Sequence, residues 1–283
     1  MALQGAWHPC WRPNFVAFCN PCCKLRRLLC YFWGQFSASR AITEFTYSGT
    51  ELDAVAEASN YYDWIIQSFA GAFGKRIVEV GAGIGTVAEL VLKRASPSEM
   101  VLIEPARNNI PELQRKFGPD PRVRVLQGYL EQFSDTLSAD TIIAVNVMEH
   151  IARDADFLRT AHSTLSRDGT LLLLVPAVPA IYGSLDRAFD HYRRYTKSGL
   201  KKLLLEAGFQ IDKLHYLNAI GVIAWFMTST VMRRKSLRRA QVQFYDRMVI
   251  PWLRRLEARL HPPIGQSLLA IARKPAATPK SVS

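Results

Sequence analysis

The chain has 283 residues, of which 49% are hydrophobic, enough for one large domain with a full core and an appendage. This composition excludes a disordered or collagen-like protein. The net charge of +12 is uneven: residues 1–43 carry five Lys or Arg and no acidic residue, residues 44–200 carry sixteen against twenty, and residues 201–283 carry fifteen against four. The basic flanks indicate an anionic partner that is contacted locally.

All five cysteines lie within the first thirty residues. A disulfide framework is therefore excluded for the main domain, and a reducing, cytoplasmic compartment is expected. Cys19 and Cys22 have metal-ligand spacing, but no second Cys or His pair follows at zinc-finger distance. We interpret residues 1–43 as a basic, cysteine-containing leader that is poorly structured; a membrane-lying segment and a transit peptide are the alternatives.

Strands and helices alternate from about residue 51. Helical spacing over residues 51–69 predicts one or two helices, and "RIVEV" at 76–80 predicts the first strand. Further strands are predicted in "MVLIEP", "VRVLQG", "TIIAVNV" and "GTLLLLVPA", and helices in "VAELVLKRA", "ADFLRTAHSTL" and "SGLKKLLLEAGF". This alternation predicts an α/β fold with a doubly wound, mostly parallel sheet, whose ligands bind at the carboxyl ends of the strands.

A long insertion precedes the last predicted strand, "QSLLAIARK". Residues 214–232 carry no formal charge, and five Lys or Arg follow within residues 233–239. Spanning a bilayer, lying in the membrane interface and forming a buried cap with a basic face all remain open. A helical stripe is interpreted as cap core: Val249, Trp252, Leu253, Leu256 and Leu260. The expected parts are thus a core of 44–217 plus 264–275, a helical cap of 218–263 and a tail of 276–283.

Three glycines alternate in "VEVGAGIGT", residues 78–86, directly after the first predicted strand. A dinucleotide-binding loop would carry its third glycine where Thr86 stands. Glu79 is poorly placed for a diphosphate but suits a cationic ammonium or sulfonium ligand. Glu104 ends the next strand, 23 positions after Gly81, where a carboxylate can accept hydrogen bonds from ribose hydroxyls. The pattern favours a sulfonium nucleoside, with a nicotinamide-dependent dehydrogenase as the fold-level alternative.

The segments "VEVGAGIGT", "VLIEP", "DTIIAVNVMEHI" and "RDGTLLLLVPA", in this order, resemble the successive motifs of class I S-adenosylmethionine-dependent methyltransferases. The resemblance covers about residues 50–215 and the terminal strand. It implies a seven-stranded sheet with an antiparallel last strand, and S-adenosyl-L-methionine as the cofactor. The cofactor-binding residues that it implies are Glu79, Gly81, Gly83, Gly85, Glu104 and Asn146.

One position departs from the family pattern. After the third strand the family often has an acidic residue that meets the adenine amino group, whereas this chain has Gly128, Tyr129 and Leu130. The resemblance therefore leaves the adenine contact open, with Gln127 or a backbone group as the candidates.

Candidate groups for the acceptor side cluster in "IYGSLDRAFDHYRRYT", residues 181–196. His191 is the best general base on chemical grounds, because histidine side chains titrate near neutrality. Asp190 and Arg194 complete the expected catalytic set, since Arg193 or Arg194 can clamp a carboxylate or phosphate. The alternative is that this polar run caps the next helix and pairs internally. Similar "HYRRYT" segments recur in methyltransferases of this broad type.

The run "NVMEHI" resembles the Glu-x-x-Glu-His run of quinone-pathway O-methyltransferases, in which those side chains can bind a divalent ion. Asn146 replaces the first carboxylate, which leaves Glu149 and His150. No metal is therefore expected.

These observations predict a methyltransferase that moves a methyl group from S-adenosylmethionine to a small-molecule or lipid-linked acceptor, at oxygen. The basic cap favours an amphipathic or anionic acceptor and peripheral contact with an anionic membrane surface. A nucleic-acid methyltransferase is an alternative, because basic flanks bind phosphate backbones, but the Asn/Asp-Pro-Pro-aromatic run of base amino methylation is missing. A non-catalytic binding protein with the same fold is the other alternative.

Overall fold

The computed structural model describes residue 46 and residues 56–276. They belong to the second of the chain's two structural units, Phe45–Ser283. The interpretations of the leader 1–43, of most of the helix expected from residue 51 and of nearly all of the tail fall outside the described residues.

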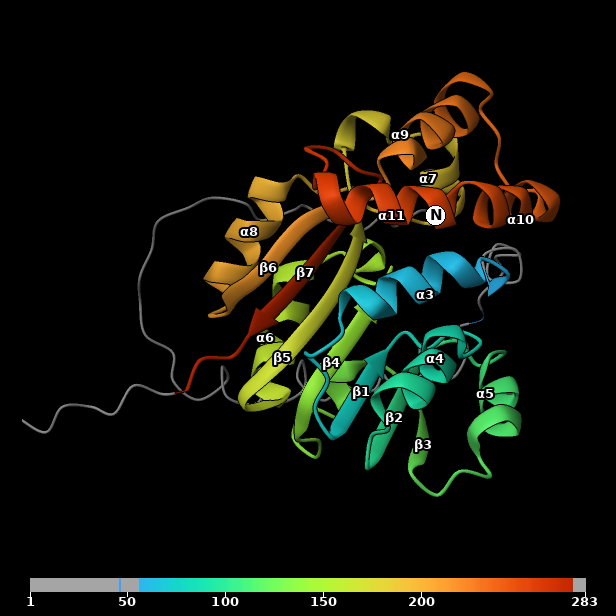
Figure 1. The fold of residues 1–283 in the computed structure, drawn as a ribbon. Helices are drawn as coiled ribbons and strands as arrows, with labels where there is room; N and C mark the ends of the chain where they lie inside the picture. Colours follow the sequence, from blue (N-terminus) through green and yellow to red (C-terminus); the bar gives the residue numbers. More distant parts are fainter. Residues whose placement is uncertain (1–45, 47–55, 277–283) are drawn as a thin grey trace, which may run out of the picture. The chain divides into compact units, whose positions relative to one another are not determined.

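A seven-stranded sheet runs through the described part, in the order β3-β2-β1-β4-β5-β7-β6 (Figure 1). Its strands are β1 (Arg76–Val80), β2 (Glu99–Glu104), β3 (Val123–Gln127), β4 (Ala139–Val145), β5 (Leu165–Pro176), β6 (Gln210–Leu217) and β7 (Ser267–Arg273). The strand β7 pairs antiparallel with β5 and β6, and the pairs among β1 to β5 are parallel. The expected seven-stranded, mostly parallel sheet with an antiparallel last strand is confirmed.

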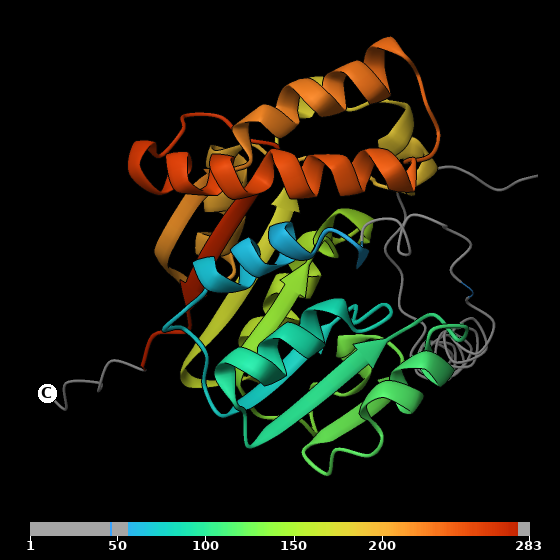
Figure 2. The same ribbon diagram turned by 45° about the vertical axis from the view of Figure 1, so that its right-hand side comes forward.

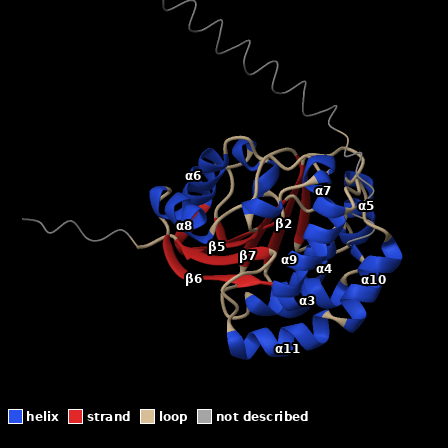
Figure 3. Cartoon of the chain, turned by 90° about the horizontal axis from the view of Figure 1, so that it is seen from above, coloured by secondary structure: helices blue, strands red, loops and turns tan. Residues whose placement is uncertain are grey.

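Helices cover both faces of the sheet (Figure 3). One face carries α3 (Ser59–Ser68), α4 (Thr86–Ala95) and α5 (Ile110–Phe117), and the other carries α6 (Asp154–Thr164) and α8 (Lys197–Glu206). Each helix buries one side against the sheet; in α8 the buried residues are Leu200 and Leu204, one turn apart. The short α7 (Ser184–Ala188) lies in the segment between β5 and α8.

The insertion before β7 forms a helical cap. It consists of α9 (Ala219–Trp225), a π-helical turn (Phe226–Val231), α10 (Arg239–Met248) and α11 (Ile250–Leu260). The helices α10 and α11 lie alongside α3 (Figure 2). Asp246 fixes this contact, because its carboxylate accepts hydrogen bonds from the backbone N–H groups of Asn60 at 3.1 Å and Tyr61 at 2.8 Å, at the N-terminus of α3.

The interpretation of the α11 stripe as cap core is wrong for most of its members. Leu253 is buried, but Trp252, Leu256 and Leu260 are 58%, 36% and 67% exposed. The reason is that the buried side of α11 consists of Ile250, Leu253 and Glu257, and the Glu257 carboxylate accepts hydrogen bonds from the backbone N–H groups of Asn218 and Ala219. Among the described residues, no helix is long and apolar enough to cross a membrane. Residues 214–232 form the end of β6, α9 and the π-helical turn.

Candidate active site

A cavity of about 1380 Å³ lies at the carboxyl edge of the sheet. Its walls include residues that directly follow β1, β2, β3 and β4, the last residue of β5, Pro176, and cap residues such as Trp225 and Phe244. Because parallel strands end at the same edge, the fold brings together loops that are far apart in the sequence.

The glycine turn after β1 forms one wall of the cavity. Gly81 has a φ of +71°, and a Cβ at this position would lie 2.6 Å from Cγ2 of Val147. Gly85 has a φ of +86° at the start of α4, and a Cβ there would collide with the ring of Phe117. Gly81 and Gly83 line the cavity, whereas Gly85 serves the packing of α4 and does not belong to the cavity wall.

Glu104 holds the turn in place from the end of β2. Its carboxylate accepts hydrogen bonds from the backbone N–H groups of Gly83 at 2.7 Å and Ala106 at 2.9 Å, and from the Asn109 amide at 3.3 Å. Burial raises the pKa of Glu104, and these three hydrogen bonds oppose the rise. A carboxylate offers about four acceptor positions, so a ligand hydroxyl can still bind to it.

Glu79 provides a buried carboxyl group beside the turn. The side chain is buried, and its Oε2 atom has no hydrogen-bond partner in the described part of the chain. Burial, and then the charge of Glu104, raise the pKa of Glu79 well above its ordinary value. A cationic ligand would reverse this rise, since an opposite charge favours the ionised carboxylate. The orphaned oxygen and the glycine turn therefore fit S-adenosylmethionine, which carries both a sulfonium and an ammonium group.

The loops after β3 and β4 also contribute residues to the cavity wall. Asn146 lines the cavity with a φ of +54°, and its backbone N–H donates to the carbonyl of Leu174 at 2.9 Å. Tyr129 and Glu131 also line the cavity. Glu131 is an acidic residue after the third strand. It follows directly on Gly128, Tyr129 and Leu130, which stand where the family often has an acidic residue.

On the acceptor side, Asp186 is the centre of a buried hydrogen-bond network. Its carboxylate lies 3.2 Å from Nδ1 of His191 and accepts hydrogen bonds from Arg194 at 2.6 Å and from the Trp225 indole at 3.0 Å. Burial alone would raise the pKa of Asp186, but the hydrogen bond with His191 and the charge of Arg194 outweigh it and lower the pKa. Asp186 therefore stays ionised and fixes the His191 ring.

Backbone contacts bring the segment with His191 against the loop after β4. The N–H of Tyr192 donates to the carbonyl of Glu149 at 2.8 Å, and the Arg193 guanidinium donates to the carbonyl of Ala152 at 2.7 Å. Arg193 also pairs with Asp154 at 2.7 Å. These contacts place His191 beside Glu149 and His150, 41 positions away from His150 in the chain.

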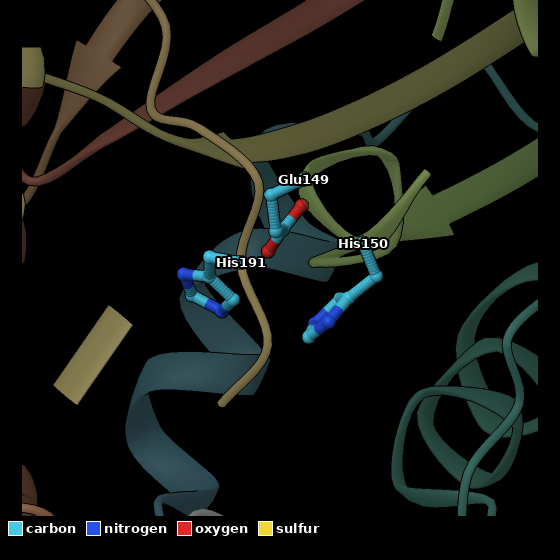
Figure 4. A group of neighbouring side chains, drawn as sticks. All are labelled: Glu149, His150 and His191. Atoms are coloured by element: carbon cyan, nitrogen blue, oxygen red, sulfur yellow. The ribbon is translucent and has the colours of Figure 1, made fainter. Parts of the chain in front are cut away.

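Glu149, His150 and His191 form a cluster, shown in Figure 4. Their potential ligand atoms all lie within 4.8 Å of one another. Burial raises the pKa of Glu149 to about 7, although the charges of His191 and Arg194 act in the opposite direction. Burial, and then His191, lower the pKa of His150 to about 4, so this imidazole is neutral at pH 7.

The two other predicted catalytic residues have different surroundings. The Arg194 guanidinium is buried, donates to the carbonyl of Ala177 at 2.8 Å and stacks on Trp225 with its Cζ 4.6 Å from the ring centroid. Asp190 lines the cavity with a φ of +55°. The alternative that the polar run pairs internally thus describes Arg194, which binds Asp186, whereas Arg193 pairs outside the run with Asp154. Glu149 and Asp186 were not among the predicted catalytic residues; the signals in the sequence were the run "NVMEHI" for Glu149 and an acid five positions before His191 for Asp186.

The fold and the site together define an α/β domain in which a glycine turn and a histidine line one cavity at the carboxyl edge of the sheet. A model of the methyltransferase domain family matches residues 56–214. The chain belongs to this family, the class I S-adenosylmethionine-dependent methyltransferases.

Individual relatives are distant. A ubiquinone biosynthesis O-methyltransferase of Azorhizobium caulinodans is 31% identical over 103 residues, which cover 35% of this chain and 40% of the relative. A tRNA U34 carboxymethyltransferase of Pseudoalteromonas atlantica is 27% identical over 124 residues, 41% of this chain and 36% of the relative. The matches thus span well under half the length of these relatives. The cyclopropane synthase MmaA2 of Mycobacterium tuberculosis shares the fold, with a TM-score of 0.51 at 19% identity over 76% of this chain and 83% of MmaA2.

Proposed function

We propose that the protein transfers a methyl group from S-adenosylmethionine to a hydroxyl oxygen of a small-molecule or lipid-linked acceptor. The observation that carries this proposal is the position of His191, which Asp186 holds in the same cavity that the glycine turn lines. Methyl transfer to a hydroxyl needs an aligned acceptor and a group that draws off the hydroxyl proton. Both needs are met within one cavity.

The cofactor half of the cavity uses the wall formed by the glycine turn. Gly81 and Gly83 allow a close approach of the ligand to the backbone, Glu104 accepts from the ribose hydroxyls, and Glu79 and Asn146 lie toward the charged amino acid end. Gly85 acts indirectly, because it lets α4 start against Phe117. When bound, S-adenosylmethionine supplies an electrophilic methyl carbon, and the electrons of its broken C–S bond stay on sulfur.

The acceptor half uses the pair of Asp186 and His191. With Nδ1–H donated to the Asp186 carboxylate, His191 keeps its Nε2 lone pair for the acceptor's proton. The negative charge of Asp186 stabilises the resulting imidazolium. Arg194 is a positioning residue in this scheme, because its guanidinium holds Asp186 rather than the acceptor. Asp190 lies at the rim of the same half.

The cap supports an amphipathic acceptor. Residues 219–264 contain nine Lys or Arg and two acidic residues, Asp246 and Glu257, both of which are buried. The exposed cap residues are therefore basic or neutral, and many are large and apolar: Ile223, Phe226, Met227, Val231, Met232, Phe244, Met248, Trp252, Leu256, Leu260 and Ile264. We name these eleven residues the cap surface. Basic residues beside apolar ones suit a membrane interface with anionic head groups.

Two members of the cap surface, Met227 and Phe244, also line the cavity. An acceptor with an apolar chain could therefore keep contact with the cap surface while its hydroxyl reaches His191. Peripheral binding to an anionic membrane and a lipid-linked acceptor follow from the same surface. Nucleic acid would use the basic residues but has no need of so many exposed apolar side chains, so we place it second.

The proposal is tested with the full chain, methyl-labelled S-adenosylmethionine and two acceptor pools, a lipid extract and total tRNA. We expect label in the organic-soluble fraction, stable to mild alkali as an ether is and an ester is not. Label in tRNA would favour the second candidate. Binding of the cofactor without transfer to either pool would support a non-catalytic protein.

A further inference from the structure

The carboxylate of Glu149 is the least satisfied group in the cluster of Glu149, His150 and His191. The side chain is fully buried, and neither of its oxygens has a hydrogen-bond partner in the described residues. Such a group is costly unless a cation compensates it. We propose that Glu149, His150 and His191 bind one divalent transition-metal ion, and that Zn²⁺ suits these donors best.

The second nitrogen of each imidazole is already occupied, as is usual for metal-binding histidines. Nδ1 of His191 faces the Asp186 carboxylate at 3.2 Å, which leaves Nε2 for the ion. The His150 ring hydrogen-bonds the backbone of Asp190. Outer contacts of this kind fix the tautomer and the ring orientation of a ligating histidine. A third outer contact, between Arg194 and Asp186 at 2.6 Å, keeps the nearby guanidinium neutralised.

A direct hydrogen bond between Glu149 and one of the two histidines does not explain why the three side chains lie together. If Glu149 were paired with either histidine, one of its oxygens would lie within 3.5 Å of a ring nitrogen, and neither oxygen has such a partner. The donors are also close enough for an ion. Tetrahedral ligands at zinc distances lie about 3.4 Å apart, so the donor atoms, which now lie within 4.8 Å of one another, must approach by at most about 1.4 Å.

The three donors leave a fourth position toward the cavity, which all three residues line. The sequence expectation of no metal rested on Glu149 and His150 alone, and His191 supplies the missing ligand from a distant segment. The role of the ion rests on the proposed methyl transfer. The ion would bind the acceptor oxygen and lower the pKa of its hydroxyl. The hydroxyl proton would then pass to solvent water at a lower pH than in the free acceptor. With its Nε2 on the ion, His191 would hold the ion, and the ion in place of that lone pair would activate the acceptor oxygen for transfer of the methyl group from sulfur.

The test uses the full chain, stripped with a chelator, dialysed and titrated with Co²⁺ and Zn²⁺. We expect one equivalent of Co²⁺ to give visible ligand-field bands of a four- or five-coordinate site, without the near-ultraviolet bands of thiolate ligands. This distinction matters because the chain has five cysteines near its start. Zn²⁺ should displace the Co²⁺. The variants Glu149→Gln and His191→Gln should each lower the affinity at least 100-fold, while His162→Gln, which changes a histidine on α6 outside the cavity, should leave it unchanged.

Two results would overturn the proposal: metal spectra that are the same in wild type and in both site variants, or full methyl transfer by the stripped protein. Should a site variant fail to fold, thiolate bands alone in the wild-type Co²⁺ spectrum would count against the site in the same way. Stoichiometric binding that is lost in the variants, with no acceptor methylated, would leave the metal site standing and count against the proposed function.

Discussion

Gly81 and Val147 approach so closely that a Cβ on Gly81 would lie 2.6 Å from a methyl group of Val147. The contact joins the loop after β1 to the loop after β4, and both loops line the cavity. A side chain at position 81 would force these loops apart, and the φ of +71° would strain it further.

We therefore expect Gly81→Ala to weaken the binding of S-adenosylmethionine more than ten-fold in calorimetric titrations. The matched control is Gly71→Ala, where φ is +84° but a Cβ would meet nothing within 4 Å. It should lose about 1 kcal/mol of stability and keep the cofactor affinity. Equal affinities of wild type and Gly81→Ala would refute the placement of the cofactor over this turn.

The Asp186→Asn variant tests the acceptor side. An amide cannot hold His191 as the carboxylate does, so we expect kcat to fall roughly 100-fold while the affinity for S-adenosylmethionine stays within two-fold. Circular dichroism and the melting temperature report on the fold, since Asp186 also binds Arg194 and Trp225. Asp212→Asn, which changes an exposed ion pair with Arg273, is the control. A wild-type kcat in Asp186→Asn would remove Asp186 from the mechanism.

Asp246→Ala tests the attachment of the cap. Its buried carboxylate accepts three hydrogen bonds from Asn60 and Tyr61 at the start of α3. The side-chain amide of Asn60 also donates to the backbone carbonyl of Asp246. Their loss should lower the free energy of unfolding by about 2–3 kcal/mol in urea titrations. The control is Asp212→Ala, which removes an exposed ion pair with Arg273 and should lower the free energy of unfolding by less than about 1 kcal/mol. Similar costs for both variants would mean that the α3 cap contact contributes little.

Asp140 makes a pH-dependent contribution to the free energy of unfolding. The hydrogen bond and ion pair with Arg76 lower its pKa in the folded protein. Its contribution is therefore present above the ordinary aspartate pKa of about 3.9 and is lost as the pH falls through the lower folded value. Because the pair is partly exposed, we expect Asp140→Asn to cost no more than about 1 kcal/mol at pH 7, and the difference from wild type to vanish once the pH has fallen below the lowered pKa of the folded protein.

The cap surface can be tested with vesicles. Replacing Phe244 and Trp252 by serine removes two large exposed side chains, so we expect sedimentation with anionic vesicles at low salt to fall at least ten-fold. Stability should change little, because neither side chain is buried. The control is Leu205→Ser, an exposed leucine on α8 outside the cap. Equal loss in the control, or no wild-type binding, would contradict membrane contact.

Most of the sheet could be predicted because its central strands are continuous apolar runs bounded by glycine or proline, as in "RIVEV" and "GTLLLLVPA". The strand β6 was not identified, since it is an edge strand with mostly polar or half-exposed residues such as Gln210, Asp212 and Lys213. The helix α5 was missed for a similar reason, because only Leu113 and Phe117 are buried in its eight residues.

The sequence by itself determined the sheet with helices on both faces, the glycine turn and Glu104 at the end of β2. Local periodicity and spacing along the chain encode these features. Only the tertiary structure decided that Asp186 holds His191, that His191 meets Glu149 and His150, and that Trp252, Leu256 and Leu260 of α11 face outward. These facts depend on backbone contacts between segments about 40 residues apart and on which side of a helix meets its neighbour, and no local pattern carries that information.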